Sequence, residues 1–204
     1  MSRSRTPKTN EAAGTAPSSP PVLRDEVGRE VVARLRSGRE AIRSAWIAEL
    51  ARRGFARLLT PEEAEAESAR IYDALIECLE TGRYHSAQAY AQDMAERDVF
   101  RGIGAKQVIG RLLVLRDVCG RALCERCGGD PAMEAGVKDV YEPVINRILT
   151  IVAMAFLQER ERAVGRGREQ LGALEHYLRA LQIDPDNRSA QAGASALSGS
   201  PARN

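Results

Sequence analysis

The stretch from Gly102 to Cys127, GIGAKQVIGRLLVLRDVCGRALCERC, reads as one amphipathic helix. At 100° per residue, its main apolar residues fall within an arc of about 100°. These residues are Val108, Leu112, Leu115, Cys119, Ala122 and Leu123. Lys106, Arg121 and Cys124 lie roughly opposite, so Cys119 is predicted to be buried and Cys124 to lie at the surface. A helix with one such apolar stripe must pack against other elements to form a core.

The same helical spacing recurs along most of the chain, and no segment alternates with period two as a half-buried strand would. Helices are predicted at about residues 22–36 and 39–53, the second with Trp46 on its apolar face. Thr60-Pro61-Glu62-Glu63 is a helix start, because it combines a hydroxyl N-cap, an early proline and a glutamate three residues after the cap. The helix that it starts is predicted to stop near Thr81-Gly82. The predicted fold class is all-α, a helical bundle.

A long final helix is predicted from Pro131, with Pro143 expected to kink it. Its apolar stripe is both the predicted core contact and the predicted dimer contact. The stripe consists of Tyr141, Val144, Ile145, Ile148, Leu149, Val152 and Phe156. Ile151 widens this stripe and Met154 lies outside it, so a second apolar surface is expected. Either a second copy of the chain covers that surface or a C-terminal helix folds back over it.

Composition divides the chain into three parts. Residues 1–21 are polar and rich in proline, so they are predicted to be a disordered tail. Residues 22–164 form the predicted bundle domain. Residues 165–204 form a C-terminal helical extension, partly disordered, whose helix at about 169–182 is separated from the long helix by glycines at 165 and 167. Residues 175–187 are similar to the second helix and exit turn of one tetratricopeptide repeat, and no second copy is visible.

Charge and apolar content exclude several classes of function. The net charge is only +2 with acidic and basic residues interleaved, and aromatic residues are 4% of the chain, so no nucleic-acid surface is predicted. The longest apolar run, Ile148–Leu157, is too short for a membrane span. Without an N-terminal apolar segment, the four cysteines are expected to be free thiols in a reducing compartment. The predicted location is the cytoplasm.

Three cysteines have the spacing of metal ligands. Cys119-x4-Cys124-x2-Cys127 matches three ligands of a plant-type iron–sulfur cluster, and Cys78 would complete a zinc site. On one helix, however, Cys119 and Cys124 diverge by about 140°. No metal and no cofactor are therefore predicted, and Cys124 with Cys127 is the candidate redox pair.

Catalytic residues are not predicted. The segment around His85 reads as a loop, whereas a haem ligand would project from a helix into an apolar pocket. No serine or cysteine is paired with a histidine, and the carboxylates are interleaved with arginines as on a solvated helix face. The chain is therefore not predicted to be an enzyme.

The order of these elements resembles a known family. A helix carrying Trp46 precedes the Thr60 start, then Ile71–Leu75, the turn at Arg101–Ile103 and a last helix through Tyr141–Arg147. This order, over about residues 24–163, resembles the N-terminal domain of the RsbR/RsbRD co-antagonist proteins of the bacterial stressosome. The resemblance implies a globin-like bundle without haem that dimerises and senses stress. The longest family members continue into a phosphorylatable STAS domain, and no α/β pattern follows the long helix here.

Two functions of different classes follow. The first is a non-enzymatic signalling and sensor module that acts through a homodimer and contacts a protein partner. The alternative is a cofactor-binding or thiol-redox protein that uses His85, or Cys119, Cys124 and Cys127, to hold haem, an iron–sulfur cluster or zinc.

Overall fold

The computed structural model describes residues 26–56, 59–125, 127–183 and 187–198. Within these residues the chain forms seven helices and no strand, which confirms the all-α prediction. The helices are α1 (Glu26–Ser37), α2 (Arg39–Arg53), α3 (Pro61–Thr81), α4 (His85–Phe100), α5 (Ala105–Glu125), α6 (Pro131–Ile183) and α7 (Arg188–Ser198). The tail predicted at residues 1–21 lies outside the described residues.

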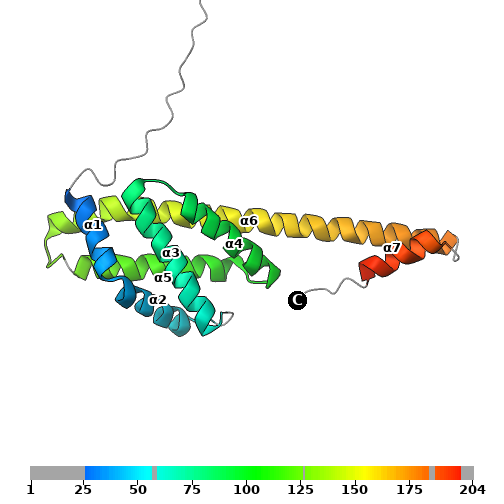
Figure 1. Ribbon diagram of the computed structural model, residues 1–204, viewed down its shortest axis with the longest axis horizontal. Coiled ribbons are helices and arrows are strands. Elements are labelled where there is room, and N and C mark those ends of the chain that lie inside the picture. The colour runs from blue at the N-terminus through cyan, green and yellow to red at the C-terminus, as the bar shows by residue number, and fades with distance from the viewer. Residues whose placement is uncertain (1–25, 57–58, 126, 184–186, 199–204) are drawn as a thin grey trace, which may run out of the picture.

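The molecule has a bundle at one end and a long arm at the other (Figure 1). Helices α1, α3, α4 and α5 contact the N-terminal part of α6, and α2 packs on α3 and α5. Helix α6 then runs on past the bundle, and α7 lies against its far end. With 53 residues, α6 is about 80 Å long. The predicted interruption at Gly165 and Gly167 is wrong, because α6 is one helix through both. Helix α6 also continues through Pro143. Proline has no backbone N–H, so the carbonyl one turn earlier lacks its helical hydrogen bond. Because Pro143 is exposed, water can bond that carbonyl instead.

The bundle core is apolar and contains the predicted stripe of α6. Six members of that stripe are buried there and Leu149 is partly buried; the six are Tyr141, Val144, Ile145, Ile148, Val152 and Phe156. Trp46 is 1% exposed, as predicted, and its indole Nε1 donates a hydrogen bond of 2.9 Å to the Arg111 carbonyl. This bond joins α2 to α5 inside the core, where an unpaired indole N–H would be costly.

The boundaries of α3 confirm the local sequence signals. Thr60 Oγ1 accepts the Glu63 backbone N–H, and the Glu63 carboxylate accepts the Thr60 N–H, which completes a capping box. The Arg101 guanidinium and this backbone N–H lower the pKa of Glu63 to about 2. Gly82 ends the helix in the left-handed conformation with φ 66°, which few other residues adopt easily.

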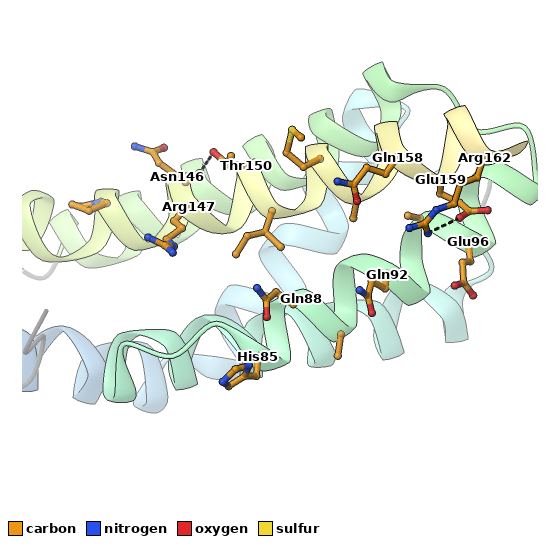
Figure 2. Close-up of a pocket in the computed structure, with 16 residues that line it drawn as sticks. His85, Gln88, Gln92, Glu96, Asn146, Arg147, Thr150, Gln158, Glu159 and Arg162 are labelled. Carbon is orange, nitrogen blue, oxygen red and sulfur yellow. Dashed lines mark hydrogen bonds and ion pairs between the residues drawn. The ribbon is translucent and has the colours of Figure 1, made fainter. Parts of the chain in front are cut away.

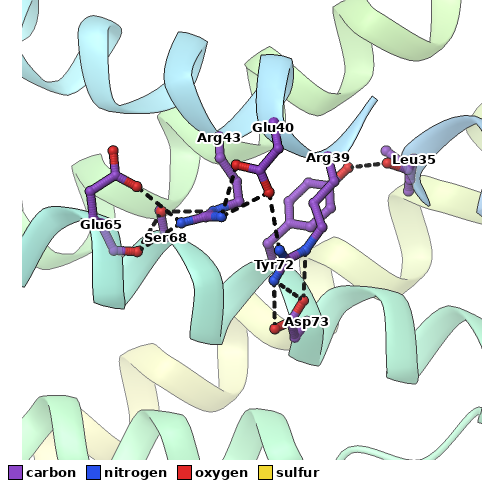
Figure 3. A network of polar contacts seen from close by, with 8 residues as sticks. All are labelled: Leu35, Arg39, Glu40, Arg43, Glu65, Ser68, Tyr72 and Asp73. Carbon is purple, nitrogen blue, oxygen red and sulfur yellow. Dashed lines mark hydrogen bonds and ion pairs between the residues drawn. The ribbon is translucent and has the colours of Figure 1, made fainter. Parts of the chain in front are cut away.

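Surface ion pairs tie α2 to α3 (Figure 3). Arg39 binds both oxygens of Asp73, at 2.7 and 2.8 Å, and Arg43 donates to Glu65 and to Ser68. Beside them the Tyr72 hydroxyl donates to the Leu35 carbonyl at 2.8 Å. Exposed pairs of this kind stabilise a protein by about 0–1 kcal/mol each, so they orient α2 on α3 more than they hold the fold.

By length and composition alone, one described helix could cross a membrane. Residues Glu134–Ala180 contain an 18-residue window of mean hydropathy 1.5, of which 33% is buried. The sequence prediction considered only uninterrupted apolar runs, whereas this window includes charged residues. A helix in the core of a globular bundle passes the same test, and α6 packs in such a core through its N-terminal part.

Candidate functional site

The most unusual surface of the described chain is an apolar line along α6. Four large apolar side chains, which we call the α6 seam, recur there at intervals of seven residues: Leu157, Val164, Leu171 and Leu178. They are 47%, 49%, 63% and 49% exposed. An apolar repeat of seven residues is the pattern by which two helices pair along a left-handed supercoil. The seam is therefore the surface best suited to receive another helix.

The terminal helix α7 packs on α6 and still leaves the seam open. Gly193 of α7 lies against Tyr177, so close that a Cβ there would stand 2.5 Å from the ring. Tyr177 lies about 100° from Leu178 around the helix, so α7 is held at one side of the seam. Met154, back in the bundle part of α6, is 50% exposed. The alternative in which the C-terminal helix folds back over this region is not what the described residues adopt.

A groove runs between α4 and α6 (Figure 2). Its volume is about 1220 Å³, and its wall combines amide side chains with a few apolar ones, among them Gln88, Gln92, Gln158, Ile151 and Met154. His85 lines one end of it, and here the sequence prediction of a loop is wrong, because His85 is the first residue of α4. The His85 imidazole is exposed in an open groove. A haem ligand would instead be enclosed by apolar side chains.

Three charged residues, one each on α3, α4 and α5, are buried in the structure. The prediction that the charged residues lie on solvated helix faces is therefore wrong for these three. Glu67 of α3, Asp98 of α4 and Arg111 of α5 are each at most 3% exposed. Arg111 Nη1 donates to Glu67 at 3.0 Å, and Nη2 donates to Asp98. Arg97 bonds both carboxylates, and the Tyr90 hydroxyl donates to Glu67 at 3.1 Å. We call these five residues the buried charge cluster.

The cluster has no unsatisfied member and joins three helices. The two carboxylates are balanced by the two guanidinium groups, so the buried site is neutral overall. Among the described residues, no buried side-chain nitrogen or oxygen lacks a hydrogen-bond partner. Every carboxylate oxygen in the cluster is paired. We therefore interpret the cluster as a structural network that specifies how α3, α4 and α5 pack. The sequence did contain a signal that Arg111 could be buried, because Arg111 falls only about 20° outside the apolar arc of α5.

The cysteines occupy different environments, as the helix geometry predicted. Cys119 and Cys78 are completely buried, and burial raises the pKa of each thiol to about 12. Cys124 is partly exposed and Cys127 is buried in the turn after α5. In the described residues, no group of three or more histidine, cysteine or acidic side chains is placed to hold a metal ion.

Replacing the buried thiol of Cys119 should be costly. We expect Cys119→Ser to lower the free energy of unfolding by about 1–3 kcal/mol, because it puts a hydroxyl where only a weakly polar thiol is accommodated. Urea unfolding followed by circular dichroism measures this difference. The matched control is Cys124→Ser at the partly exposed position, which we expect to change stability by about 0.5 kcal/mol or less. Equal effects at the two positions would contradict the assigned environments.

Comparison with known proteins assigns no family to this chain. No family model, no curated protein and no solved structure matches the chain.

Proposed function

We propose that this protein is a non-enzymatic signalling module of the bacterial stress-sensor type, which works as a homodimer paired through α6. The observation that carries the proposal is the α6 seam, four exposed apolar residues in one line on a helix that extends past its own bundle. The likeness of the helix order to the N-terminal domain of the stressosome co-antagonists supports the same function. In this proposal the bundle receives the signal and α6 carries it to the partner.

A second copy of the chain is the partner that suits the seam best. A line of large apolar side chains on a charged helix is seldom left bare, and two copies related by a two-fold axis cover the line with itself. The alternate positions of the heptad are Ala153, Arg160, Gly167 and Leu174. Ala153 and Gly167 are small enough for the two backbones to approach closely, and Arg160 is the only charge in the line.

The oligomeric state tests this proposal directly. We expect the full chain to sediment as a dimer at micromolar concentration. We expect Val164→Glu with Leu171→Glu to raise the dissociation constant roughly 100-fold, which corresponds to about 2.7 kcal/mol. This change would place four like charges in one seam.

The matched control is Leu113→Glu. Leu113 is a 40% exposed leucine on α5, away from the seam. This variant should dimerise like the parent chain and keep the same helical circular dichroism per residue. A full chain that stays monomeric up to about 100 μM would defeat the proposal, as would a dimer disrupted equally by Leu113→Glu.

A further inference from the structure

Amide side chains recur along the groove between α4 and α6. Gln88 and Gln92 are one turn apart on α4, about 6 Å along the helix axis. Figure 2 shows both side chains pointing from α4 toward α6. Gln158 lines the same groove from α6, and all three glutamines are exposed. An amide offers both a donor and an acceptor, as a peptide unit does, so this wall suits a ligand that has both.

The three glutamine amides are not occupied by other side chains of the groove. Among the residues drawn in Figure 2, interactions join only Thr150 to Asn146 and Arg162 to Glu159. The glutamine amides are joined to none of the residues drawn there. Their donors and acceptors are therefore available to a ligand.

The two ends of the groove differ in charge. At one end the Arg147 guanidinium lies 4.7 Å from the centre of the Tyr84 ring, a contact that holds the cation in place. Arg147 is exposed, and no carboxylate of the described residues is ion-paired with it. At the other end Arg162 is paired with Glu159 at 3.4 Å, and Glu96 adds a further negative charge. An anionic group of a ligand is therefore favoured at the Arg147 end.

The spacing of the groove side chains fits an extended peptide. Two residues of an extended chain span about 6.7 Å, close to the step from Gln88 to Gln92, so these amides can bond alternate peptide units. Ile151 and Met154 offer an apolar contact midway, and the flexible Met154 side chain is 50% exposed. From Arg147 the α6 wall continues for about 22 Å, the length of about six or seven extended residues.

Other occupants suit this wall less well. A helix bonds most of its backbone N–H and C=O groups internally, so it would leave the amides without main-chain partners. Helices that dock in grooves also use several large apolar anchors, and the large apolar side chains in this wall are Ile151 and Met154. A small molecule would be covered on one side only in a groove this open, whereas binding pockets enclose most of a ligand.

We infer that the α4–α6 groove binds an extended peptide segment of a partner protein, with an acidic residue of the peptide at Arg147. Gln88 and Gln92 bond its main chain, and an apolar side chain packs on Ile151 and Met154. The inference goes beyond the dimer proposed above, because all the lining residues belong to one chain. Gln158 also lies about 100° around α6 from Leu157, the nearest residue of the α6 seam.

The probe for this inference is a phage-displayed library of random peptides of about seven residues, selected on the full chain. We expect the selected peptides to share an acidic residue near one end. Each is then labelled with fluorescein, and its dissociation constant is measured by anisotropy. Arg147→Met should raise that constant at least roughly tenfold, because it removes hydrogen bonds to a charged group. Gln88→Ala with Gln92→Ala should raise it roughly fivefold or more.

The matched control is Arg83→Met, which removes an exposed arginine that does not line the groove. It should change the constant by about twofold or less. The variant Val164→Glu with Leu171→Glu should bind the peptides like the parent chain, so a failure of dimerisation is distinguished from a failure of this site. All these variants replace exposed side chains, and circular dichroism checks that the bundle stays folded.

Methylation of the peptide backbone tests the extended conformation. The N–H groups of an extended chain point alternately to its two sides, so methylating one alternate set should weaken binding roughly tenfold and the other set much less. Equal losses from both sets would indicate a helical ligand and overturn the inference. So would a library that yields no binding peptide, equal effects of Arg147→Met and Arg83→Met, or peptides that bind only the dimer.

Discussion

Arg111→Met should lower the free energy of unfolding by about 3–5 kcal/mol, because it removes one partner from a buried ion pair and leaves charge uncompensated. Glu67 and Asp98 would each lose a guanidinium bond in a site closed to water. Arg97, itself partly exposed, cannot neutralise two carboxylates alone. Urea unfolding measures the loss.

Two further variants decide whether buried charge is the cause. Arg101→Met removes an arginine from the pair with Glu63, where both side chains are about one-third exposed, and we expect it to cost about 1 kcal/mol or less. The triple variant Glu67→Gln, Asp98→Asn, Arg111→Met removes all three charges at once. It should be more stable than Arg111→Met alone, because no unpaired carboxylate remains. If the triple variant is less stable, simple loss of contacts explains the effect and the electrostatic argument is wrong.

Trp46→Ala should cost about 3–5 kcal/mol as well, since it empties the volume of the largest fully buried side chain in the described residues. It also leaves the Arg111 carbonyl without its indole donor. The control Trp46→Phe keeps most of the ring and loses only the N–H, so we expect a smaller loss of about 1–3 kcal/mol.

Because Trp46 is the only tryptophan, its emission reports on the assignment before any substitution is made. The native protein should emit at short wavelength and resist acrylamide, and both properties should be lost on unfolding. Red-shifted native emission that acrylamide quenches freely would show that Trp46 is not buried.

Local signals in the sequence predicted most of the helices. The Thr60 capping box, the stop at Gly82 and the opposite orientations of Cys119 and Cys124 depend on residues within one or two turns of each other, and the structure confirms all three. Helix α2 lies at the predicted residues, 39–53. Such features need no knowledge of distant parts of the chain.

Features that depend on distant partners could not be predicted in the same way. Arg111 meets Glu67 across 44 positions of sequence, so neither residue alone shows that its charge is compensated in the core. The α6 seam was hidden for a different reason. Glycines at 165 and 167 indicated a break, which assigned Leu157 and Leu171 to separate helices. The interval of seven becomes visible only when α6 is one helix.

The three glycines in the arm of α6 have a thermodynamic consequence. Gly165, Gly167 and Gly172 have no side-chain neighbour within 4 Å at the site of a missing Cβ, and each disfavours the helix by about 1 kcal/mol relative to alanine. A solitary helix of this kind is marginal in water, and pairing with a second copy would supply the missing free energy. The helicity of the arm then depends on protein concentration: dilution below the dissociation constant would melt the arm while the bundle stays folded.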